Sequence, residues 1–136
     1  MSFDYILDTF GKFRKRRTRF TELEEKAISL LTSFVDGKMS NKEFAFAFDG
    51  VRKNFIELTK KDGQTVIDED TPLWLNSILG LHYMKWLQFQ QVKWYFGEHP
   101  DELVGERKDR FDELQQMRYD ERFVETCKGV LKELRT

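Results

Sequence analysis

A chain of 136 residues has room for one domain, and its hydrophobic fraction of 40%, with thirteen Phe, is enough for a packed core, which excludes global disorder. The single cysteine excludes a disulfide within the chain. The net charge of −1 conceals an asymmetry, because six basic residues and no acidic residue lie between positions 12 and 19, so the remainder is acidic.

The N-terminus lacks the basic-then-apolar pattern of a signal peptide. No uninterrupted apolar run approaches the roughly 20 residues that are needed to span a bilayer. We therefore expect a cytoplasmic protein with no membrane partner.

The first predicted helix follows Ser2, which can cap it, and runs into the basic stretch. Its apolar residues recur at helical spacing: Phe3, Ile6, Leu7, Phe10 and Phe13. This basic helix, at about residues 3–19, is interpreted as an N-terminal extension of a single helical domain that spans residues 1–136.

Two further helices are predicted at about residues 21–36 and 40–61. Gly37 stands where a helix C-cap is expected, and Ser40 with Glu43 forms the pattern of a capping box. Asp62 and Gly63 then predict a turn. No segment of the chain predicts a strand.

The longest predicted helix covers about residues 72–96 and is apolar around most of its circumference. Thr71 is expected to cap it, with Pro72 at its first position. Because a helix that is hydrophobic all round is usually buried, we expect the other helices to pack around it.

Two more helices are predicted, at about residues 109–117 and from about residue 120 onward, and the second carries a regular apolar face. The apolar residues of that face are Phe123, Cys127, Val130, Leu131 and Leu134. The predicted fold class is therefore all-α, a bundle of about five to six helices around a long aromatic central helix.

The residues that usually carry catalysis or bind metal ions are scarce. His82 falls on the apolar face of the long helix and is interpreted as a core residue hydrogen-bonded within the bundle, His99 as a turn residue, and Cys127 as part of the core. Neither histidine follows a glutamate by three positions, and no glycine-rich phosphate loop occurs. We therefore expect no enzyme activity, no cofactor and no metal site.

The basic stretch predicts a contact with nucleic-acid phosphates, through Arg14, Arg16, Arg17 and Arg19. Phe13 within it and Phe20 directly after it add rings of the kind that stack on bases. The alternative interpretation is that basic residues collect at the negative end of a helix dipole.

Residues 28–48 combine a helix that ends in Phe-x-x-Gly, a hydrophobic residue, a capping serine, and Glu-Phe at the start of the next helix. This stretch resembles the start of the colicin D immunity protein family. The matching residues are Phe34, Gly37, Met39, Ser40, Glu43, Phe44 and Phe48. The resemblance covers about twenty residues.

Members of that family, and similar immunity proteins of contact-dependent growth inhibition systems, neutralise RNase toxins by occupying the active cleft. The resemblance thus implies an immunity protein that binds and neutralises a cognate nuclease toxin, an RNase or tRNase, by blocking its cleft. The alternative is a helical adaptor or regulator that contacts nucleic acid through the basic N-terminal arm.

A nuclease cleft is basic because it holds phosphates, so its inhibitor needs an ordered acidic surface. The sequence offers two acidic segments, and each also has a purely structural interpretation as a helix cap or a solvated face. The predicted partner-binding residues are Asp68, Glu69, Asp70, Glu98, Asp101, Glu102 and Glu106.

Overall fold

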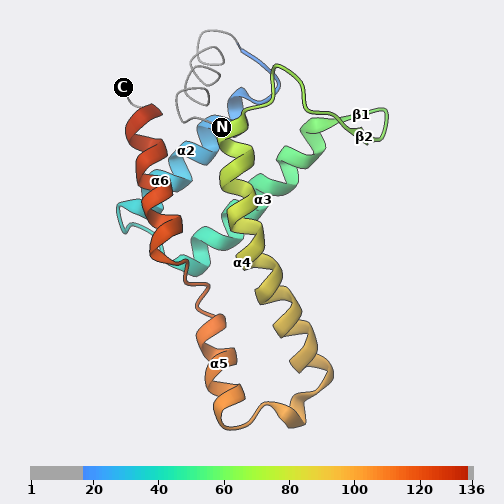
Figure 1. Cartoon of the computed structure of the whole chain (residues 1–136), viewed down its shortest axis with the longest axis vertical. Helices are drawn as coiled ribbons and strands as arrows, with labels where there is room; N and C mark the ends of the chain where they lie inside the picture. The colour runs from blue at the N-terminus through green and yellow to red at the C-terminus, as the bar shows by residue number, and fades with distance from the viewer. Residues whose placement is uncertain (1–16, 135–136) are drawn as a thin grey trace.

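The computed structural model describes residues 17–134, and most of that part of the chain is helical (Figure 1). Its elements are α2 (Thr21–Val35), α3 (Asn41–Thr59), β1 (Lys60–Lys61), β2 (Gln64–Thr65), α4 (Leu73–Glu98), the 3-10 turn η1 (Pro100–Glu102), α5 (Glu106–Leu114) and α6 (Glu121–Leu134). The predicted all-α fold class is confirmed. Residues 3–16 of the predicted N-terminal helix lie outside the described residues, and residues 17–19, which were predicted to belong to it, are not helical.

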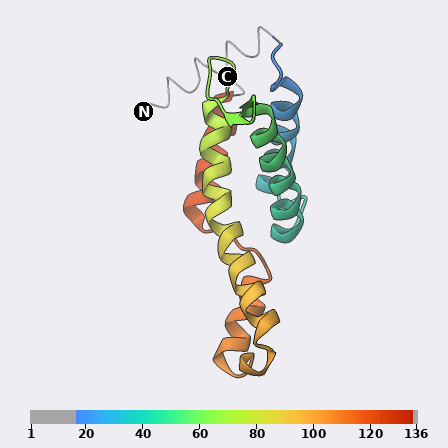
Figure 2. The same ribbon diagram turned by 90° about the vertical axis from the view of Figure 1, so that its right-hand side faces the viewer.

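Four of the helices form a bundle of two layers, with α2 and α3 in one layer and α4 and α6 in the other (Figure 2). Around the bundle, α2 contacts α3, α3 contacts α4, α4 contacts α6, and α6 contacts α2. The core between them takes its largest buried side chains from Trp74, Phe20, Phe44, Phe48, Leu31 and Leu75.

The α2–α3 hairpin confirms the predictions made for its two caps. Gly37 has a φ of +73°, and its N–H donates to the Phe34 carbonyl, which ends α2. The Ser40 hydroxyl accepts from the Glu43 N–H at 3.1 Å, while the Glu43 carboxylate accepts from the Ser40 N–H at 3.3 Å. The residues that carry the family resemblance therefore build this hairpin.

The predicted turn at Asp62 and Gly63 is present, and it closes a two-stranded hairpin in which Lys60 pairs with Thr65 and Lys61 with Gln64. Both turn residues have positive φ, +52° and +79°. A two-residue Asp-Gly loop with this backbone matches the twist of paired strands. The expectation that no strand forms was therefore wrong at this point.

The start of α4 also differs from the prediction. Pro72 is the N-cap and Leu73 is the first helical residue. Thr71 caps nothing, because its hydroxyl accepts from the Asp68 N–H at 3.1 Å and lies 3.2 Å from the Asp68 carboxylate. Thr71 instead closes the loop before the helix.

Only the first part of α4 is central in the bundle. Trp74, Leu75, Ile78, Leu79 and His82 are buried there. Trp86 and Phe89 are the last buried residues and form a second apolar cluster with Ala45 and Met117. Beyond this cluster, residues 90–114 leave the bundle as an extension that we call the distal arm, in which α5 packs back on α4 (Figures 1 and 2).

The last helix, α6, returns to the bundle and confirms its predicted apolar face. Phe123, Cys127, Val130, Leu131 and Leu134 are all buried. The Asp120 carboxylate accepts from the Phe123 N–H at 2.8 Å and caps the helix. Burial raises the pKa of the Cys127 thiol to about 12, so this thiol is a core group with little thiolate character.

Candidate functional site

The acidic turn at residues 68–70 is largely neutralised within the protein. The Asp68 carboxylate lies 3.0 Å from both the Arg19 guanidinium and the Lys61 ammonium, and Asp70 lies 3.5 Å from Arg19. Desolvation acts to raise the pKa of Asp68, but the hydrogen bonds from Lys61 and Arg19 outweigh it and hold this pKa well below its ordinary value. Of the three acidic residues, only Glu69 is exposed.

Arg19, predicted as a nucleic-acid contact, links three segments of the bundle instead. Its Nε donates to the Leu58 carbonyl at 2.7 Å, and its Nη2 donates to Asp68 at 3.0 Å. The guanidinium also lies 4.5 Å from the centre of the Phe20 ring. Arg17 is exposed and forms a long ion pair, at 3.8 Å, with Glu22, which is also exposed. Arg14 and Arg16 lie outside the described residues.

Replacing Arg19 with alanine is expected to lower the free energy of unfolding by about 1–3 kcal/mol, because it leaves the Leu58 carbonyl without its donor and removes one of the two cations that neutralise Asp68. The matched control is Arg17→Ala, which should change this free energy by less than about 0.5 kcal/mol. Urea unfolding followed by circular dichroism measures both. Equal stability of the two variants would show that Arg19 is not a structural link.

The second acidic segment forms the free end of the distal arm. Glu98 ends α4, Asp101 and Glu102 lie in η1, and Glu106 begins α5 (Figure 1). Among the described residues, Glu98, Asp101 and Glu106 have no ion-pair partner. Glu102 accepts a hydrogen bond from the Tyr95 hydroxyl, which raises the pKa of Tyr95. Residues 98–113 contain seven acidic and three basic residues, so the end of the arm is acidic.

The structure therefore brings together four of the seven predicted acidic residues and separates them from the other three. The two groups lie at opposite ends of α4, whose 26 residues at about 1.5 Å per residue span roughly 39 Å. A single partner of ordinary size is expected to cover one group or the other.

Large apolar side chains are exposed beside these acidic residues. The exposed fraction is 68% for Trp94 and 65% for Val104. Trp94 lies one helical turn before Glu98 and therefore on the same side of α4. An exposed indole is the kind of side chain that anchors protein interfaces, and no sequence pattern marked it, because the helix is apolar around most of its circumference.

A buried polar network joins α3, α4 and the segment before α6. His82 is fully buried, with its Nε2 at 3.2 Å from the Asp49 carboxylate and its Nδ1 at 2.7 Å from the Tyr119 hydroxyl. Arg52 donates to Asp49 at 2.7 Å. The predicted hydrogen-bonded core histidine is confirmed, although the sequence did not indicate its partners.

The ionisation of this network follows from its burial. Burial lowers the pKa of His82, against the nearby Asp49 carboxylate, which acts to raise it. A neutral imidazole carries one N–H, and because a carboxylate only accepts, that hydrogen is on Nε2. The Tyr119 hydroxyl then donates to Nδ1, and its own pKa is raised far above the ordinary value by burial. The arrangement holds three segments together and encloses the imidazole.

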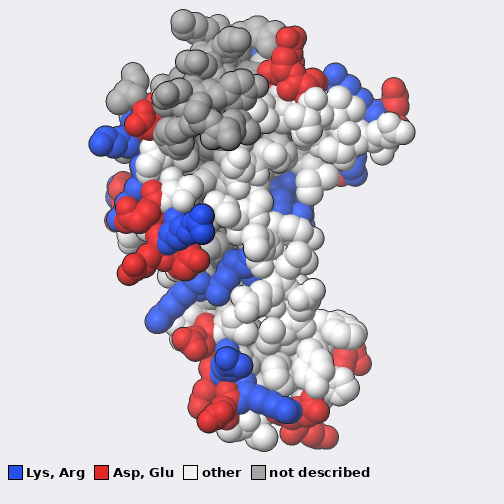
Figure 3. All heavy atoms as spheres, in the orientation of Figure 1, with Lys and Arg blue, Asp and Glu red and all other residues white. Residues whose placement is uncertain are grey.

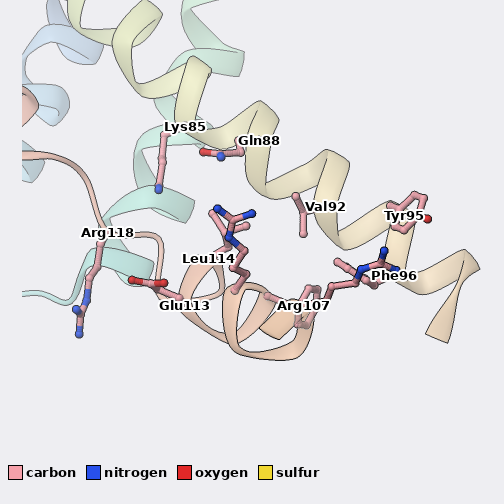
Figure 4. A pocket seen from close by; sticks show the side chains of 11 residues that line it. Lys85, Gln88, Val92, Tyr95, Phe96, Arg107, Glu113, Leu114 and Arg118 are labelled. Atoms are coloured by element: carbon pink, nitrogen blue, oxygen red, sulfur yellow. The ribbon is translucent and has the colours of Figure 1, made fainter. Parts of the chain in front are cut away.

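A groove runs along α4 on the side that α5 and the start of α6 face (Figure 4). It consists of two hollows of about 590 and 620 Å³ that share Lys85, Gln88 and Arg118, and we call it the α4–α5 groove. Lys85 and Val92 project from α4 toward α5 (Figure 4). The sequence did not predict this groove, since it depends on how α5 folds back.

Within residues 17–134, the structure shows neither a metal-binding group of side chains nor a membrane-spanning helix. No group of three or more His, Cys, Asp or Glu side chains in that range is placed to hold a metal ion. No helix in the same range is both long and apolar enough to cross a bilayer.

Comparisons with protein-family models, with curated proteins and with solved structures find no match for this chain.

Proposed function

We propose that this protein is an immunity protein that binds a cognate nuclease toxin and blocks its active cleft with the acidic end of the distal arm. The observation that carries the proposal is a group of carboxylates on an extension of the bundle that also exposes Trp94; Glu98, Asp101 and Glu106 have no ion-pair partner among residues 17–134. A basic cleft that holds phosphates is complementary to such a surface in charge.

The shape of the arm supports the same proposal. An inhibitor that fills a cleft needs a projecting element, and the distal arm is the part of the described chain that projects from the bundle (Figure 2). Figure 3 shows Asp and Glu atoms bordering its free end, with Lys and Arg atoms between them. Carboxylates at such a contact steer association, while a desolvated indole supplies the apolar anchor.

The nucleic-acid alternative receives less support from the described residues. Arg19 is bound to carboxylates of the protein itself, and Arg17 is the remaining described arginine of that stretch.

The proposal expects a toxin gene immediately upstream of this chain's gene, and the test is an RNA-cleavage assay with the nuclease domain of that toxin. The protein is expected to inhibit that domain stoichiometrically. The double substitution Asp101→Lys and Glu106→Lys should weaken binding by at least about 2 kcal/mol if the carboxylates are buried at the contact, and Trp94→Ala should weaken it by a similar amount.

The matched control reverses two exposed acidic residues of the bundle, Glu57→Lys with Glu69→Lys, and should leave inhibition unchanged. Circular dichroism melting checks that all variants fold. Failure of the unchanged protein to inhibit the nuclease domain rejects the proposed function. If the arm variants still inhibit fully and the control pair loses inhibition, the contact lies at the acidic turn, because the control pair includes Glu69.

A further inference from the structure

We propose that the α4–α5 groove is a docking site for an acidic amphipathic helix of a partner protein. This inference does not rest on the proposed inhibition of a nuclease, because it concerns a different face of the arm and a ligand of the opposite charge.

The residues of α5 that line the groove are mostly basic or apolar, and the carboxylates at the end of the arm are not among them. Arg107, Arg110 and Leu114 recur at spacings of three and four residues and line the groove. Of the acidic residues of α5, Glu113 lines the groove, whereas Glu106, Asp109 and Asp112 do not. The groove lining is therefore mostly basic and does not include the acidic residues Glu98, Asp101 and Glu106 of the end of the arm.

The basic residues of the groove are available to a ligand. Five cationic side chains line it against two acidic ones: Lys85, Arg107, Arg110, Arg118 and Arg122 against Glu113 and Asp120. Within residues 17–134, Arg107 reaches Glu102 only at 4.0 Å, and the other four have no ion pair. In Figure 3, Lys and Arg atoms gather where the arm meets the bundle. Unpaired cations around a hollow favour an anionic occupant.

The apolar lining of the groove favours side chains over nucleic-acid bases. It includes aliphatic residues from both helices: Leu81, Met84, Val92 and Leu114. Its aromatic rings pack on one another: the ring centres of Tyr95 and Phe96 and those of Phe96 and Phe111 meet edge-on at 5.3 and 5.5 Å, and Tyr119 stacks on Phe123 at 4.2 Å. Base recognition needs free ring faces, whereas aliphatic contacts suit the apolar face of a helix.

The length of the groove suits the same occupant. Its lining residues on α4 extend from Leu81 to Phe96, which corresponds to roughly 22 Å or about four turns of a helix lying alongside. A helix in such a groove makes contact through residues at spacings of three, four and seven, and its acidic residues then meet the cations on both sides.

The probe for the test is a fluorescein-labelled peptide of about four helical turns with Leu on one face and Glu on the other, added to the full-length protein. Fluorescence anisotropy is expected to show binding in the micromolar range that weakens with salt. A peptide with Lys in place of each Glu should not bind. A single-stranded oligouridylate RNA of similar length should also not bind.

The variant that tests the cations is Arg110→Glu with Arg118→Glu, both at exposed positions, and it should weaken peptide binding at least about tenfold. The matched control, Lys26→Glu with Lys42→Glu, changes two exposed lysines of the bundle and should bind as the unchanged protein does. Met84→Ser, at a position with an exposed fraction of 72%, should weaken binding several-fold by removing apolar contact alone.

Four results would overturn the proposal. Three concern the probes: no binding of the acidic peptide, binding of the peptide by the Arg110→Glu/Arg118→Glu variant as tightly as by the unchanged protein, or preferential binding of the RNA.

The fourth result is self-association of the protein that this variant abolishes, because a second copy of the chain would then occupy the groove. Sedimentation velocity without peptide detects that case.

Discussion

Replacing Phe44 with alanine is expected to lower the free energy of unfolding by about 3–5 kcal/mol. The Phe44 ring is fully buried and stacks on Phe34 at 4.2 Å and on Phe48 at 4.9 Å, with the edge of Tyr119 at 5.5 Å. Truncation removes these contacts and leaves a cavity where α2, α3 and the segment before α6 meet. Urea unfolding provides the measurement.

The matched control is Phe46→Ala, two residues further along the same helix, where the exposed fraction is 47%. Its ring lies at the edge of the second cluster, with its centre 5.0 Å from the centre of the Trp86 ring. The free energy of unfolding is therefore expected to fall by less than about 1.5 kcal/mol. A similar loss in both variants would mean that the Phe44 stack is not the centre of the core.

The second large effect is expected from Asp49→Ala, which should lower the free energy of unfolding by about 3–5 kcal/mol. Asp49 has an exposed fraction of 1% and accepts from both His82 and Arg52. Its removal leaves the His82 N–H buried without an acceptor and leaves Arg52 without its carboxylate. The control Glu57→Ala, an exposed residue of the same helix, should cost less than about 0.5 kcal/mol.

A further variant distinguishes two contributions to the free energy of unfolding: the loss caused by leaving buried polar groups unpaired, and the net stabilisation that the intact network provides. The combination Asp49→Leu, His82→Leu and Tyr119→Phe replaces all three polar groups by apolar ones. This variant should recover part of the stability lost in Asp49→Ala, because no buried polar group remains unpaired. Arg52 can then stay over the Tyr83 ring, 4.3 Å away. A triple variant less stable than Asp49→Ala contradicts this account.

The features that sequence reasoning predicted well depend on local chemistry. The capping box at Ser40 and Glu43, the C-cap at Gly37 and the apolar face of α6 involve residues within a few positions of each other. The interactions at such sites form wherever the chain is helical, so the pattern and the structure agree.

The features that sequence reasoning missed depend on what covers each side of a helix. Because α4 is apolar nearly all round, its periodicity could not indicate that Met84 and Trp94 would be exposed. One signal was available: α5 carries only Phe111 and Leu114 as large apolar residues, too few to cover a long helix. Likewise, nothing near Arg19 in sequence indicated that its partners would be Leu58 and Asp68.

The continuity of α4 has a mechanical consequence. One unbroken helix runs from Trp74 in the core to Glu98 at the free end of the arm. An α-helix bends only slightly over such a length. The orientation of the free end of the arm is therefore set by how the first part of α4 packs in the bundle. A partner that meets this end therefore meets a preorganised surface and loses little conformational entropy in ordering it. A ligand bound in the α4–α5 groove would contact α4 and α5 together and so further restrict the movement of the arm.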